Sequence, residues 1–99
     1  MTRYYSHTII LPDETRLTDF VVDVEGSSVT YYPFVGEIHS TIYAEHPILL
    51  SHRPDLQGKT VSLDQLSWAM GDAATTTVHA YSLTPCPTCM GDRYVLSRL

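Results

Sequence analysis

Alternating apolar and polar positions predict β-strands along most of the chain. Within residues 16–25, Phe20, Val22 and Val24 share one face of a strand. The acidic Asp19 and Asp23 share the other face with a valine. A period of two residues is typical of a sheet with one buried side. Aromatic and β-branched residues in short runs predict further strands, at residues 3–10, 29–35, 38–44, 48–51, 75–83 and 94–99.

Turn-forming residues separate these predicted strands. The segment Leu11-Pro12-Asp13-Glu14 ends the first strand, and Gly26-Ser27-Ser28 predicts a hairpin turn after the second. Pro33 has no N–H to give to a sheet ladder, so its strand is expected at a sheet edge or at a bulge.

One short helix is expected in the second half. Ser62 and Gln65 have the spacing of a capping box, and Gly71 stands where a helix would stop. The apolar residues between them at helical spacing are Leu63, Leu66 and Met70. The chain is therefore expected to form a single domain over residues 1–99, mainly β, as a small barrel or sandwich of about six or seven strands with one short helix.

The charge balance argues against nucleic acid as a partner. The chain has a net charge of −5, and its six basic residues are spread out rather than clustered. Phosphate recognition needs a basic patch. No run approaches the ~20 apolar residues that cross a bilayer, and the first residues lack a signal-peptide pattern. We therefore expect a soluble, cytoplasmic protein without a membrane contact, whose cysteines stay reduced or hold metal.

The motif Cys86-Pro87-Thr88-Cys89 is the sharpest local feature. Two thiolates at this spacing can hold a zinc ion, and His79 is the nearest imidazole in the sequence. The same pair could act as a redox couple or remain an incidental turn with free thiols. Zinc is the one cofactor that the residues suggest.

A catalytic apparatus is harder to find. Glu37 and His39 are two residues apart and could point to the same side of a strand, where a carboxylate beside an imidazole is a possible acid–base pair. The sequence has no nucleophile elbow, no phosphate-binding glycine loop and no HExxH motif. We therefore expect a protein that is not an enzyme, with a small hydrolase-like enzyme using Glu37 and His39 as one alternative.

Clustered aromatic residues favour an interaction surface instead. The tyrosine doublets place half of their side chains away from the core, because neighbouring strand residues face opposite sides. Exposed aromatic residues at a sheet edge are typical of protein interfaces. The first hypothesis is thus a non-enzymatic interaction or assembly module that pairs with itself or another protein; a zinc-stabilised domain is the other alternative. The candidate interface residues are Tyr31, Tyr32, Pro33 and Phe34.

The first half of the chain also resembles part of a known enzyme superfamily. The segments at 9–13, 19–24 and 29–34 are similar to the small β composite domain of amidohydrolase-type metal-dependent hydrolases, and to short bacterial proteins that carry only this unit. In that superfamily the composite domain lies beside a catalytic barrel. The barrel's metal-binding histidines have no match in this sequence. The resemblance therefore implies the fold of the side domain and none of its chemistry.

Overall fold

The structure is a computed structural model that describes residues 2–26, 28–36, 41–71, 77–89 and 91–99. These residues form eight strands of one sheet and one short helix, which confirms the mainly β fold. The elements are β1 (Thr2–Ile10), β2 (Arg16–Glu25), β3 (Ser28–Pro33), β4 (Thr41–Ala44), β5 (Ile48–Ser51), β6 (Thr60–Ser62), α1 (Ser67–Met70), β7 (His79–Pro85) and β8 (Arg93–Arg98).

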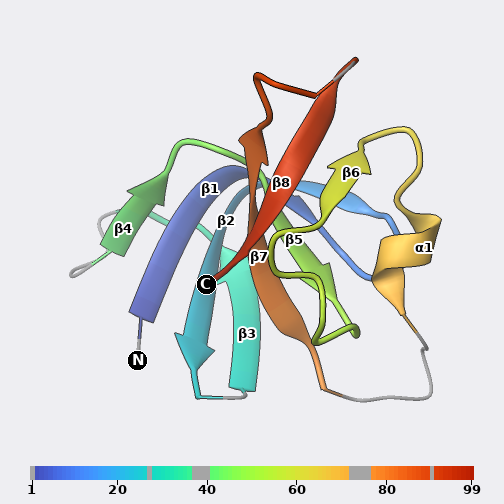
Figure 1. Cartoon of the computed structure of the whole chain (residues 1–99). Helices are drawn as coiled ribbons and strands as arrows, with labels where there is room; N and C mark the ends of the chain where they lie inside the picture. Colours follow the sequence, from blue (N-terminus) through green and yellow to red (C-terminus); the bar gives the residue numbers. More distant parts are fainter. Residues whose placement is uncertain (1, 27, 37–40, 72–76, 90) are drawn as a thin grey trace.

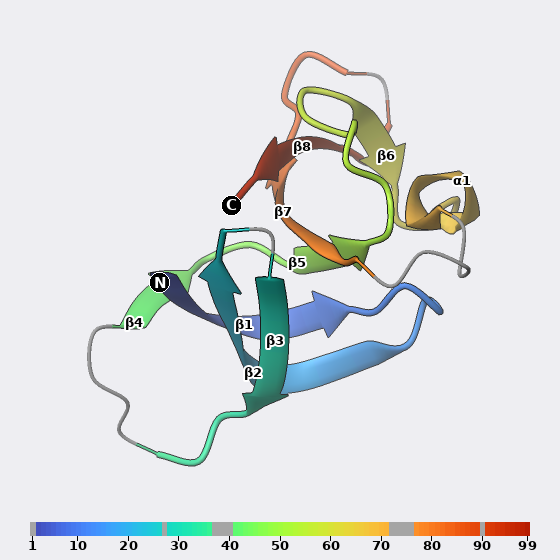
Figure 2. The ribbon, with the colours of Figure 1, turned by 90° about the horizontal axis from the view of Figure 1, so that it is seen from below.

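Strand β1 connects the two parts of the sheet. It pairs with β2 on one side, and on the other side its first half pairs with β4 and its end with β5. The strand order is β3-β2-β1-β5-β7-β8-β6, with β4 beside β1, so the sheet is open. In Figure 2, β1, β2 and β3 form one layer, while β5, β7, β8 and β6 curve round above it with α1 at the side.

Two hydrophobic cores meet at β5. Ile48 and Leu50 point into the smaller core, which they share with residues of β1, β2, β3 and β7. Leu49 points into the larger core between β5–β8 and α1. All four residues of β5 are buried, because this strand is covered on both faces. The buried members of the larger core are Ile10, Leu49, Leu56, Val61, Leu66, Ala69, Met70, Tyr81, Leu83 and Leu96.

Several predicted elements are confirmed. The second strand covers residues 16–25, and Phe20, Val22 and Val24 all face the smaller core. Strand β3 lies at the start of the strand order, so Pro33 ends an edge strand as predicted. The left-handed Gly71, with φ of 80°, ends α1.

The predicted start of the helix is wrong. Ser62 is the last residue of β6, and its carbonyl accepts a hydrogen bond from the Gln65 N–H in a tight turn. The helix begins only at Ser67, after Leu66, and no side chain caps it. The strand β6 was not predicted, because three residues are too short to show a period. Within the described residues, no helix is long and apolar enough to cross a membrane.

Candidate functional site

The three predicted zinc ligands do not form a site. Cys86 and Cys89 are joined in a disulfide, which leaves no thiolate for a metal and also contradicts the expectation of reduced cysteines. His79 begins β7 while Cys86 follows its end, a separation of roughly 20 Å along the strand. Nowhere in the described ranges do three or more His, Cys, Asp or Glu side chains gather in a way that could hold a metal ion.

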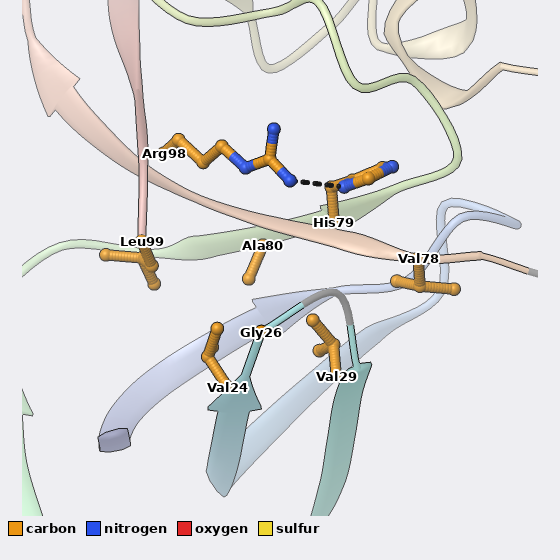
Figure 3. Close-up of a pocket in the computed structure, with 8 residues that line it drawn as sticks. All are labelled: Val24, Gly26, Val29, Val78, His79, Ala80, Arg98 and Leu99. Carbon is orange, nitrogen blue, oxygen red and sulfur yellow. Dashed lines mark hydrogen bonds between the residues drawn. The ribbon is translucent and has the colours of Figure 1, made fainter. Parts of the chain in front are cut away.

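His79 instead forms part of a small surface hollow. The Arg98 guanidinium donates a hydrogen bond to His79 Nδ1 at 2.9 Å, as Figure 3 shows. Partial burial, then the charge of Arg98 and the nearby His52, lower the pKa of His79. The hollow holds about 200 Å³ and is open to solvent. The space inside it that a water-sized molecule can occupy is only about 10 Å³, close to that of a single water molecule, so the hollow is too small for a metabolite.

The predicted acid–base pair cannot be assigned a geometry. Glu37 and His39 lie outside the described residues. The hydrolase-like alternative therefore stays a prediction.

An aromatic surface covers the side of β1 that faces away from the smaller core. The Tyr5 ring lies edge-on to Phe34 and Tyr43, with ring centres 4.9 and 5.4 Å away. Val21 pairs with both Tyr5 and Tyr32 across the sheet and is fully buried, although it belongs to neither core. We call Tyr5, Tyr32, Phe34 and Tyr43 the outer aromatic face.

A polar network fixes the position of Tyr5. Its hydroxyl donates a hydrogen bond to Asp19 Oδ1, and the His7 Nδ1–H donates to the same oxygen at 2.9 Å. Asp19 has a positive φ of 57° in the middle of β2, a conformation that asparagine and aspartate tolerate better than most residues. The hydrogen bonds from Tyr5, then His7, lower the pKa of Asp19.

A second polar network lies beside the first on the same face. The Arg3 guanidinium donates to Asp23 Oδ1 at 2.9 Å, and the Tyr32 hydroxyl donates to Asp23 Oδ2 at 3.2 Å. Burial, followed by the charge of Asp23, raises the pKa of Tyr32. Both networks hold their tyrosine rings in place, so the outer aromatic face is a preorganised surface.

The four predicted interface residues do not form one patch. Tyr31 leans toward Phe20 on the side of the smaller core, whereas Tyr32 lies on the opposite face. Pro33 ends the edge strand, and Phe34 lies beyond it against the ring of Tyr5. Only Tyr32 and Phe34 therefore contribute to the outer aromatic face.

Sequence reasoning placed residues 41–44 in a predicted strand but did not identify that strand as an exposed sheet edge. Strand β4 pairs with β1 along one side, and no strand within the described ranges pairs with its other side. Its Ile42 and Tyr43 are 52% and 67% exposed, on opposite faces of the same edge. The available signal was a run of four residues, Thr-Ile-Tyr-Ala, with no charge and no proline.

Comparison with known proteins does not assign the chain to a family. No family model, no curated protein and no solved structure matches the chain. The resemblance to the composite domain of amidohydrolases stays a prediction.

Proposed function

We propose that this chain is a non-enzymatic assembly module that pairs with a second copy of itself through the β4 edge. The observation that carries the proposal is the exposure of Ile42 and Tyr43 on the two faces of one uncharged edge strand. Such an edge is a template for strand addition, and natural proteins protect edges that must stay free with charges or proline.

The sheet edge at β3 has this protection. The Phe34 N–H donates to the Asp19 carbonyl on β2. Because bonding alternates along an antiparallel strand, the nitrogen of the preceding residue, Pro33, faces away from β2. The edge therefore lacks a donor where a new strand would pair. At the far end of the strand order, β6 offers only three residues. These features leave β4 as the edge that favours association.

The net charge of the chain also favours β4 as the place of contact between two copies. Two chains of net charge −5 repel each other, and the repulsion is weakest where neither surface carries charge. Antiparallel pairing of two β4 strands about a two-fold axis keeps Tyr43 on the outer face in both copies and Ile42 on the inner face. Such a contact is isologous and closes as a dimer instead of growing into a filament.

The other functional hypotheses find less support. The disulfide removes the ligands of the zinc-stabilised domain. The resemblance to the composite domain agrees with assembly more than with catalysis, because that domain carries none of its superfamily's catalytic residues.

Sedimentation velocity of the full chain over a range of concentrations tests the proposal. We expect a concentration-dependent dimer that Ile42→Lys abolishes, because two added charges would face each other across the edge. Thr30→Lys is the matched control, since it adds the same charge to an exposed position on β3 and should leave the dimer intact. A monomer at all concentrations, or equal loss with both variants, would overturn the proposal.

A further inference from the structure

The disulfide between Cys86 and Cys89 lies in the connection between β7 and β8, and it joins no separate parts of the fold. The two residues are three positions apart. The connection is already closed beside them, because the Cys86 N–H donates to the Arg93 carbonyl at 3.0 Å and Pro85 pairs with Tyr94. A disulfide stabilises a protein mainly by closing a long loop in the unfolded chain, so a disulfide that closes so short a loop adds little to the free energy of unfolding.

The same disulfide lies outside both cores. Neither cysteine is among the core residues, and each is only partly buried. The neighbouring Pro87 and Thr88 are exposed, and the connection projects beyond the rest of the fold at the top of Figure 1. A thiol reagent can therefore approach the sulfur atoms without opening the protein.

We propose that Cys86–Cys89 is a reversible thiol–disulfide exchange site for external thiols, whose opening is not coupled to unfolding. The proposal does not depend on the β4 contact. It assigns to the motif a chemical role that a structural disulfide would not have, because a structural disulfide is protected from exchange by the fold around it.

The geometry also assigns a direction to the exchange. The Thr88 hydroxyl lies 3.7 Å from Cys86 Sγ, where it can donate a hydrogen bond to a thiolate. Cys86 is therefore the better leaving group, and an external thiolate attacks Cys89 Sγ. The new bond joins the external sulfur to Cys89, and the electron pair of the broken bond leaves with Cys86 as a thiolate. A second external thiolate then attacks the sulfur of the first, which releases the Cys89 thiolate and an oxidised external disulfide.

The test compares rates of reduction by dithiothreitol in the folded chain and in concentrated urea, followed by alkylation and intact mass measurement. We expect the native rate to lie within ~10-fold of the denatured rate, since exchange needs no unfolding. The reduced protein should keep its near-ultraviolet circular dichroism. A native rate ~1,000-fold or more below the denatured rate would mean that the bond opens only through unfolding, and would overturn the proposal.

Thr88→Val tests the direction of attack. The substitution keeps the shape of the side chain but removes the hydroxyl, so the native reduction should slow several-fold. Thr84→Val, an exposed threonine of the same hairpin, is the matched control and should leave the rate unchanged. An unchanged rate with Thr88→Val would overturn the assignment of Cys86 as the leaving group.

Discussion

The two parts of the sheet use their hydrophobic residues differently. The part formed by β5–β8 and α1 supplies nine of the ten buried residues of the larger core, and Ile10 of β1 is the tenth. The part formed by β1–β4 has a smaller core, but it keeps large apolar side chains at its surface. Four of the five large hydrophobic residues that the structure shows exposed belong to this part: Tyr31, Val35, Ile42 and Tyr43. The fifth, Trp68, lies on α1 beneath the Arg53 guanidinium.

This difference suggests that one part of the sheet provides stability and the other provides a surface for association. Burial of apolar surface is the main source of stability in a small domain, so the larger core should dominate the free energy of unfolding. Exposed apolar side chains contribute little to that free energy but can drive association. We therefore expect substitutions in the two parts to separate stability from self-association.

Leu96→Ala should have the largest effect on stability. Leu96 is fully buried in the larger core, and truncation leaves a cavity there. We expect the free energy of unfolding to fall by ~2–5 kcal/mol in urea denaturation. Val35→Ala is the control, because Val35 is 85% exposed and its truncation should change stability by less than ~0.5 kcal/mol. Similar losses of unfolding free energy in both variants would contradict the claim that the larger core dominates stability.

Tyr43→Thr should weaken association more than stability. The variant loses the contact between the rings of Tyr43 and Tyr5, which costs ~0.5–1.5 kcal/mol of stability at most. Sedimentation equilibrium should show a dimer at least ~10-fold weaker, because an aromatic anchor is removed from the contact. Trp68→Thr removes an exposed aromatic residue from the other part and should leave the dimer unchanged. A dimer that responds to Trp68 instead would place the contact on α1.

Tyr5→Phe should have a smaller effect, confined to the β1–β4 part. The ring contacts remain, but Asp19 loses its hydrogen bond from the hydroxyl. The pKa of Asp19 is lowered in the folded chain, so its contribution to stability is present above 3.8 and is lost as the pH falls through the lowered value. In the variant, nuclear magnetic resonance titration should show the pKa of Asp19 closer to 3.8. An unchanged pKa would mean that Tyr5 does not act on this carboxylate.

The smallest expected effect is a pH dependence from His79. Because the pKa of His79 lies below 6.5 in the folded chain, its neutral form adds stability above that value. The contribution is lost as the pH falls, when protonated His79 can no longer accept from Arg98. Thermal melts should show a slight fall in Tm between about pH 7 and pH 5. His79→Asn keeps an acceptor that does not titrate, so it should flatten this slope; an equal slope would assign the effect to other groups.

The sequence predicted the elements better than their arrangement. Periodicity placed β2 correctly, and a short apolar run placed β5. The missing N–H of Pro33 predicted an edge strand. Sequence spacing suggested a zinc site at Cys86, Cys89 and His79. Spacing does not show that β7 runs as an extended strand between His79 and Cys86 and so keeps them apart. The meeting of Tyr5, Asp19 and Tyr43 depends on the pairing of three strands, and pairing is a tertiary property that no local pattern encodes.

Hydrogen–deuterium exchange at low and high protein concentration tests the central claim most directly. If β4 pairs with a second copy, amides of residues 42–44 should exchange more slowly at high concentration, while those of Val29 and Tyr31 on β3 should not change. Protection at β3 in place of β4, or no dependence on concentration at either edge, would contradict the account.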